Sequence, residues 1–248
     1  MSWIDGPMVG FDTETTGVSP QNDRIVTAAV IRRHGGAVEV REWLINPGIE
    51  IPARATEVHG ITTAKAQAEG ANPADALEQI ATALADALGA GIPVVGFNVQ
   101  YDLTILEAEL ARHGLRTLAQ RLPQGIRPII DPLVLDRHLD TYRKGKRKLI
   151  DMCGTYRVQV VADDLHAADA DVLATLDLVP AIAERYPSLA TVALQDLHDQ
   201  QASAHSAWAN RFRAWLVSKG TVDDLPSPEW PVATLQVPSD DADAPALF

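Results

Sequence analysis

Two acidic side chains interrupt an apolar stretch near the N-terminus, in the sequence MVGFDTETTG (residues 8–17). Asp12 and Glu14 are two positions apart, so in a β-strand both carboxylates project from the same face. Two adjacent carboxylates repel each other, and one takes up a proton unless a cation lies between them. No basic residue occurs in this stretch. The pattern therefore indicates either a solvated strand end or a pair of ligands for a metal cation.

Three more residues of similar chemistry occur later in the chain. Asp102 follows the apolar run PVVGFN, at the start of an expected helix, and His166 and Asp171 flank the start of another. Central strands of one sheet deliver their ends to a common edge, which is the usual place for a site in α/β folds. Taken singly, His166 is typical of a helix cap or a surface histidine, and Asp171 of an acid favoured by the helix dipole. Taken together, we expect these residues to meet the first two acids.

These residues form three ordered motifs that resemble the His-type branch of the DEDD exonuclease superfamily. The family pattern is DxE, then NxxxD after an apolar strand, then HxAxxD, which reads here as Asp12-Thr13-Glu14, Asn98 to Asp102, and His166, Ala168 and Asp171. The branch includes DnaQ-like proofreading subunits of DNA polymerase III, oligoribonucleases and related 3′→5′ exonucleases. The segment EVHGIT (57–62) is also similar to one in the proofreading group. The resemblance covers about residues 7 to 186.

Hydrophobic periodicity predicts the elements that position these motifs. Strand-like runs separated by turn-rich breaks near residues 8–14, 24–33 and 37–45 indicate an antiparallel meander. Helices are predicted for residues 73–89, 101–113 and from about 168, with short buried strands at 93–98 and 127–131. This order indicates a mixed sheet covered by helices. The resemblance implies more specifically a ribonuclease H-like α/β fold, with a five-stranded mixed sheet of three antiparallel strands and then two parallel ones.

The chain divides into three predicted parts. Residues 1–186 form the exonuclease domain, and residues 187–220 contain a long amphipathic helix. Residues 221–248 are rich in Pro and Asp, which predicts a flexible acidic tail. Its end, APALF, is similar to sliding-clamp-binding peptides, but Ala244 stands where a glutamine is expected. The helix is expected to bury four side chains: Leu197, Trp208, Phe212 and Trp215.

Composition bounds the cellular setting and the partners. The chain has 248 residues, 46% of them hydrophobic, and a single cysteine, Cys153, which fits a reducing compartment. No signal peptide is visible at the N-terminus, and no stretch approaches the roughly 20 apolar residues of a membrane span. We therefore expect a cytoplasmic protein without a membrane segment. The formal net charge of −12 counts against a non-specific nucleic-acid binder.

The acidic residues also predict the type of cofactor. Oxygen-only ligands suit hard cations, so Mg²⁺ or Mn²⁺ is expected rather than zinc. The resemblance implies two such ions, held by the four carboxylates of Asp12, Glu14, Asp102 and Asp171. It also implies that His166 is the general base that deprotonates the attacking water, a role that suits its ordinary pKa.

Substrate contacts are predicted in two places. The resemblance implies that Thr13, Thr15 and Thr16 line a pocket for the 3′-terminal nucleotide. His59 either reaches that nucleotide or holds its own loop, and Asn98 is expected to orient the second motif more than to contact substrate. The basic run YRKGKRKL (142–149) is either a solvated face or a grip for phosphates. Its candidate residues are Arg143, Lys144, Lys146 and Arg147.

The sequence thus predicts a metal-dependent 3′→5′ exonuclease that releases nucleoside 5′-monophosphates from single-stranded ends. DNA is favoured over RNA by the resemblance to proofreading subunits. The alternatives are an oligoribonuclease-like enzyme for short RNA, a non-catalytic polymerase-associated binding module, and a phosphodiesterase acting on a small nucleotide. The presence of all five motif residues counts against the binding module. No polymerase motif is visible, so a proofreading role would need a polymerase or sliding-clamp partner.

Overall fold

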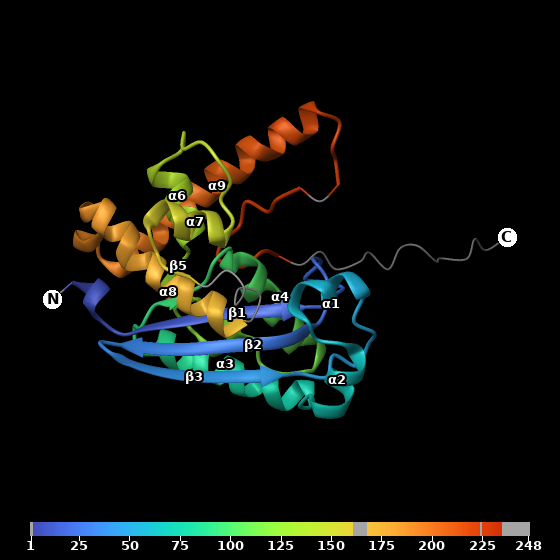
Figure 1. The fold of residues 1–248 in the computed structure, drawn as a ribbon. Helices are drawn as coiled ribbons and strands as arrows, with labels where there is room; N and C mark the ends of the chain where they lie inside the picture. Colours follow the sequence, from blue (N-terminus) through green and yellow to red (C-terminus); the bar gives the residue numbers. More distant parts are fainter. Residues whose placement is uncertain (1, 161–167, 224, 235–248) are drawn as a thin grey trace.

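The computed structural model describes residues 2–160, 168–223 and 225–234. Within these ranges, no helix combines the length and the apolar character needed to cross a membrane. A central sheet with helices on both faces forms the body of the molecule (Figure 1).

The sheet has five strands in the order β3-β2-β1-β4-β5. Strands β1 (Met8–Thr15), β2 (Ile25–His34) and β3 (Ala37–Leu44) form the antiparallel meander. The short strands β4 (Val94–Val95) and β5 (Ile129–Ile130) add to the other side of β1 in parallel. The predicted mixed sheet, with three antiparallel strands followed by two parallel ones, is confirmed.

Helices connect and cover these strands. Helix α3 begins as predicted, because Oδ1 of Asn72 accepts a 2.9 Å hydrogen bond from the backbone N–H of Ala74 and Pro73 occupies the first turn. The described helices are η1 (Trp3–Asp5), α1 (Ala53–His59), α2 (Thr63–Glu69), α3 (Pro73–Gly89), α4 (Val99–Arg112), α5 (Leu118–Arg121), α6 (Pro132–Leu139), α7 (Leu149–Tyr156), α8 (Ala168–Arg185), η3 (Pro187–Thr191) and α9 (Leu194–Ser218).

Alternation along β1 divides the core into two layers. Val9 and Phe11 pack with α3 and α4 on one face of the sheet, whereas Met8 packs with α8 on the other. Figure 1 shows α8 crossing the face of the sheet opposite to α3. Because side chains alternate, Asp12 and Glu14 lie on the α8 face.

Helix α9 differs from its prediction. Its buried residues end at Ala209, and its C-terminal half extends past the body of the molecule (Figure 1). Leu197 is buried as expected, but Phe212 is 38% exposed and Trp215 is 53% exposed. The prediction that these two aromatic side chains lie inside is wrong, because no residue of α9 after Ala209 is buried.

The segment after α9 also departs from its prediction. Composition predicted a flexible tail from residue 221, but residues 225–234 pack on the domain. Trp230 is buried, with its ring centroid 4.9 Å from that of His198. The backbone N–H of Ala233 donates a 2.9 Å hydrogen bond to Oγ1 of Thr104. The clamp-like peptide at 244–248 lies outside the described residues.

Candidate active site

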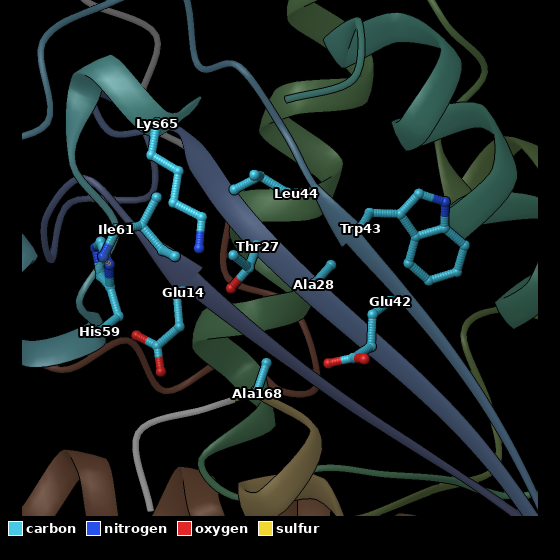
Figure 2. Close-up of a pocket in the computed structure, with 10 residues that line it drawn as sticks. All are labelled: Glu14, Thr27, Ala28, Glu42, Trp43, Leu44, His59, Ile61, Lys65 and Ala168. Atoms are coloured by element: carbon cyan, nitrogen blue, oxygen red, sulfur yellow. Dashed lines mark hydrogen bonds between the residues drawn. The ribbon is translucent and has the colours of Figure 1, made fainter. Parts of the chain in front are cut away.

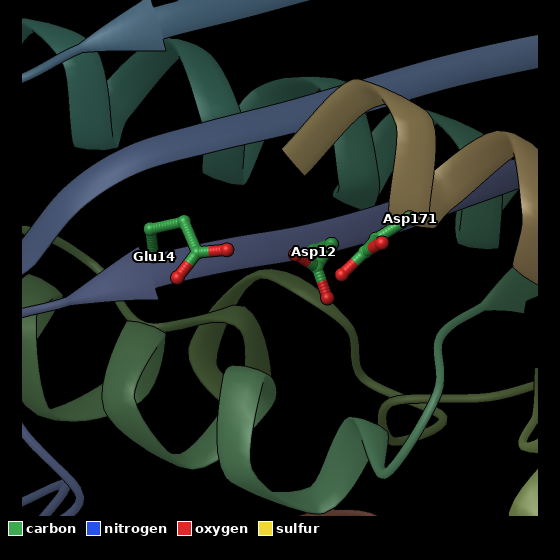
Figure 3. A group of neighbouring side chains, drawn as sticks. All are labelled: Asp12, Glu14 and Asp171. Atoms are coloured by element: carbon green, nitrogen blue, oxygen red, sulfur yellow. The ribbon is translucent and has the colours of Figure 1, made fainter. Parts of the chain in front are cut away.

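Three carboxylates meet near the C-terminal end of β1 (Figure 3). Asp12 and Glu14 project from β1, and Asp171 comes from the first turn of α8. Each side chain offers an oxygen, and the three oxygens lie within 4.8 Å of one another. This arrangement can hold a cation.

Close packing of α8 on β1 brings Asp171 to this position. A Cβ atom added at Gly10 would lie 2.3 Å from Cγ1 of Val172 and 3.1 Å from the side chain of Leu176. Only a residue without a side chain allows the helix to approach the strand so closely. Gly10 therefore sets the distance between the carboxylates of the strand and that of the helix.

Asp102 lies in the first turn of α4 and is buried. Its Oδ1 accepts hydrogen bonds from the backbone N–H of Thr13, at 3.0 Å, and from the Thr13 hydroxyl, at 2.6 Å. Asp102 is not part of the compact group of three, but its charge raises the pKa of Asp12. It forms a fourth carboxylate beside that group.

A further buried acid, Asp131, holds the start of α4. Its carboxylate accepts hydrogen bonds from the backbone N–H groups of Asn98, at 3.2 Å, and Val99, at 3.1 Å. Asn98 has a left-handed backbone with a φ of 60°, and its side chain does not cap α4. Its expected orienting role stays a prediction. Sequence reasoning missed Asp131. The signal was an acid directly before Pro132 at the end of a buried strand, which is typical of a helix cap.

Burial and mutual repulsion both raise the pKa values of these carboxylates, and burial contributes most. Burial, followed by the charges of Asp102, Glu14 and Asp171, raises the pKa of Asp12 well above its ordinary value. Burial and the neighbouring acids raise the pKa of Glu14 to about 7. Burial also raises the pKa of Asp102 to about 7, against the lowering effect of its hydrogen bonds from Thr13.

Cation binding would relieve this repulsion. Neither Asp12 nor Glu14 forms an ion pair with a lysine or arginine in the described part of the chain. A group of oxygen donors of this kind fits a hard divalent cation. The donor set therefore supports divalent metal binding.

A cavity of about 250 Å³ opens beside Glu14 (Figure 2). Thr27 lines its floor, and His59 and Lys65 come from α1 and α2. Figure 2 shows the Lys65 amine extending toward Thr27 and Glu14. Sequence reasoning missed Lys65, because a single lysine on a short exposed helix carries no distinguishing pattern.

His59 is the last residue of α1 and lines the cavity beside Glu14. Its Nδ1 accepts a 3.1 Å hydrogen bond from the backbone N–H of Ile61, which holds the turn after α1. Burial lowers the pKa of His59, so the ring is neutral at pH 7. A neutral ring that accepts at Nδ1 carries its hydrogen on Nε2. His59 thus both supports its loop and lines the cavity.

The three threonines of the first motif have partners inside the protein. Thr13 bonds Asp102, as described above. The Thr15 hydroxyl donates a 2.7 Å bond to the carbonyl of Gly17, and the Thr16 hydroxyl donates a 2.8 Å bond to Asp23. None of the three lines the cavity beside Glu14. These hydrogen bonds hold the strand end, and a contact of the three threonines with the 3′-terminal nucleotide stays a prediction.

The basic run divides into two kinds of residue. Arg143 and Arg147 both bind Oδ2 of the fully buried Asp136, at 2.9 Å and 2.5 Å. These ion pairs hold the loop after α6 in place, and phosphate binding by the two arginines stays a prediction. Lys144 and Lys146 are exposed. His166, the predicted base, lies outside the described residues.

Comparisons with known proteins identify relatives of this chain. A model of the exonuclease family represented by RNase T matches residues 9–179. DNA polymerase III PolC-type of Streptococcus sanguinis is 32% identical over 176 residues, and that of Streptococcus pyogenes serotype M18 is 34% identical over 176 residues. Each alignment covers 71% of this chain and 11% of the relative, so the chain spans about a tenth of these relatives.

Solved structures support the ribonuclease H-like fold. Exonuclease I of E. coli in complex with a dA16 oligonucleotide superposes with a TM-score of 0.63 at 21% identity, covering 74% of this chain and 42% of that one. Exonuclease I of Methylocaldum szegediense gives a TM-score of 0.59 at 22% identity, again covering 74% of this chain and 42% of that one. The family match and the fold together show that the chain belongs to the exonuclease family, in the DnaQ-like DEDD group of 3′→5′ exonucleases.

Proposed function

We propose that this chain removes nucleotides from the 3′ end of single-stranded DNA and releases nucleoside 5′-monophosphates. The observation that carries the proposal is the group of Asp12, Glu14 and Asp171, with ligand oxygens within 4.8 Å of one another. Their mutual repulsion makes a divalent cation, Mg²⁺ or Mn²⁺, the natural occupant.

The chain's own residues supply the framework for this reaction. When bound, two divalent cations stabilise the attacking and leaving oxygens of an in-line phosphoryl displacement. Asp12, Glu14, Asp171 and Asp102 would hold them, with Asp102 fixed by its hydrogen bonds from Thr13. His166 is proposed as the general base that accepts the proton of the attacking water, as in the His-type branch.

The cavity beside Glu14 is proposed to receive the 3′-terminal nucleotide. Its lining includes a cation, Lys65, and the ring of His59, whose Nε2 is buried. The Lys65 amine suits a phosphate. Apolar lining from Leu44 and Ile61 suits a base or sugar face.

The choice of DNA rests on the relatives. Those matched in sequence are DNA polymerases, and the exonuclease I structures hold dT13 and dA16 oligonucleotides. A polymerase partner is proposed on the same ground, because the relatives carry the matching segment within a much longer polymerase chain.

The test uses matched single-stranded DNA and RNA oligomers labelled at the 5′ end, in Mg²⁺ and in Mn²⁺. We expect a ladder that shortens from the 3′ end, faster on DNA, with nucleoside 5′-monophosphates as products. A matched DNA oligomer with a blocked 3′ end should resist. Faster cleavage of RNA would favour the oligoribonuclease-like alternative, and internal cleavage of the blocked oligomer would contradict the proposal.

A further inference from the structure

Three aromatic rings lie against one another along the C-terminal half of α9. The centroids of Trp208 and Phe212 are 5.5 Å apart with an interplanar angle of 22°, and those of Phe212 and Trp215 are 5.6 Å apart at 11°. At these separations near-parallel rings are offset, so part of each face stays open. Phe212 and Trp215 are exposed. We call this group the aromatic ladder.

The surroundings of the ladder are basic, although the chain has a net charge of −12. No Asp or Glu occurs between residues 200 and 222, whereas Arg211, Arg213 and Lys219 do. The ionisable side chains of this stretch, histidine aside, are therefore all cations, although Asp223 follows directly after it. Such a combination complements a polyanion whose units carry flat faces.

Neighbouring elements add to the same basic surface. The guanidinium of Arg137, on α6, lies 3.7 Å from the centroid of the Trp208 ring. Helix α6 packs against α9 and continues into the loop that carries the exposed Lys144 and Lys146. The lysines of the basic run therefore follow α6, the helix whose Arg137 contacts the Trp208 end of the ladder.

A chain of contacts through His205 connects the ladder to the helix that carries Asp102. His205 lies one helical turn before Trp208, with ring centroids 5.7 Å apart. Nε2 of His205 is 3.3 Å from Nε2 of Gln100, in the first turn of α4. Asp102, the fourth carboxylate, follows two residues later on the same turn. The ladder thus begins beside the helix end that carries part of the site and leads away from it.

We propose that the aromatic ladder binds the bases of a nucleic-acid single strand whose 3′ end occupies the active site. Bases stack on Phe212 and Trp215, and the phosphates between them pair with the surrounding cations. Aromatic faces accept any base, so this contact is independent of sequence. The inference rests on the proposed exonuclease function and adds to it a binding surface for the strand upstream of the cleaved bond.

The test measures binding without cleavage, by fluorescence anisotropy of the full chain in chelator. The probes are 5′-labelled oligothymidylates of about 4 and about 16 nucleotides, the span of single-strand binding sites. Wild type should bind the longer probe more tightly. The variant Phe212→Leu/Trp215→Leu should lose on the order of tenfold or more in affinity for it. Trp215→Phe, which keeps a ring, should retain most of the affinity.

The matched control is Val38→Ala/Val40→Ala, which removes exposed apolar side chains from β3. It should bind the longer probe like wild type. Equal wild-type affinity for both probes, or binding by the double leucine variant within about twofold of wild type, overturns the proposal. So does light scattering that shows a wild-type dimer separated by the leucine substitutions, since the ladder would then join two copies.

Cleavage assays with the same proteins distinguish a failure of the ladder proposal from a failure of the proposed exonuclease function. Cleavage of the short probe from its 3′ end in Mg²⁺, together with ladder-independent binding of the long probe, overturns the ladder and leaves the exonuclease. Ladder-dependent binding of the long probe without cleavage of either probe supports the ladder and contradicts the exonuclease.

Discussion

The Thr13 hydroxyl donates a 2.6 Å hydrogen bond to Oδ1 of Asp102, across 89 positions of sequence. The backbone N–H of the same residue donates a second bond to the same oxygen. Thr13 lies between Asp12 and Glu14, with its side chain on the opposite face of β1. This short stretch of β1 therefore carries the carboxylates of Asp12 and Glu14 and also fixes the carboxylate of Asp102, which belongs to α4.

Replacing Thr13 by Val tests this relationship. Valine keeps the shape and the backbone N–H but removes the hydroxyl donor to Asp102. Loss of a partner that orients a metal ligand typically costs 10–100-fold in affinity or activity, and we expect about tenfold in kcat/KM. Thr191→Val, at an exposed position, is the matched control. Activity of the Thr13 variant within about twofold of wild type would remove the positioning role of the hydroxyl.

Gly10 should control the position of Asp171. In Gly10→Ala the new methyl group meets Val172, so α8 must shift, at a cost of about 1–3 kcal/mol in the free energy of unfolding. Activity should fall with it, because Asp171 moves with the helix. Denaturant unfolding and steady-state kinetics measure the two effects.

Two further variants make this prediction specific. Val172→Ala in the same chain should restore part of both losses, since the two residues are in contact. Gly36→Ala, which would meet no atom within 4 Å, is the control. An unimpaired Gly10→Ala protein would show that the strand and helix are not closely packed.

The metal-free protein should lose stability as pH rises from about 4 to 7. The pKa values of Glu14 and Asp102 are each raised to about 7, so in this window the folded state binds protons that the unfolded state has released. The free energy of unfolding then falls with rising pH, by an amount on the order of 3 kcal/mol for Glu14 alone. Denaturant unfolding in chelator at several pH values measures it.

Divalent cations should oppose this loss. Binding requires the ionised carboxylates, so Mg²⁺ or Mn²⁺ should stabilise the protein most at pH 7 and above, and least near pH 5. A metal-free stability that rises steadily across the window would contradict the described electrostatics of the site.

The basic run should contain two functional groups: arginines that stabilise the fold and lysines that bind the oligonucleotide. Asp136→Ala leaves Arg143 and Arg147 without their buried partner and should cost about 3–5 kcal/mol in the free energy of unfolding. Lys144→Gln/Lys146→Gln should leave the free energy of unfolding nearly unchanged. The slope of log affinity against log salt for oligonucleotide binding should fall by the equivalent of about two phosphate contacts. An unchanged salt slope would make the two lysines a solvated face.

Local chemistry explains what could be predicted from the sequence. The alternation of Asp12 and Glu14 follows from strand geometry alone, and the start of α3 follows from Asn72 and Pro73. Motif order adds Asp102 and Asp171, because each lies where a strand or helix delivers its end to one edge of the sheet. These features depend on neighbours in sequence, so they can be recognised without the fold.

Tertiary packing explains the rest. Arg143 and Arg147 look like any exposed cations until the fold buries Asp136 against them, although it lies only 7 and 11 positions earlier. The amphipathic pattern of α9 contains an apolar face, but it does not say where the helix extends past the body, so Phe212 and Trp215 were expected inside. Trp230 stands in a Pro- and Asp-rich segment, so its composition predicts flexibility. The partner that orders the ring, His198, is 32 positions away and cannot be recognised from the local sequence.

Hydrolysis of a 5′-labelled DNA single strand by wild type and Asp12→Asn tests the central claim most directly. Both proteins would be assayed in Mg²⁺ and in chelator, with metal affinity followed by calorimetry. The metal site predicts a Mg²⁺-dependent ladder from the 3′ end for wild type, and activity at least roughly a hundredfold lower for a folded Asp12→Asn protein with weakened metal binding. Equal cleavage by both proteins, or wild-type cleavage that persists in chelator, would contradict it.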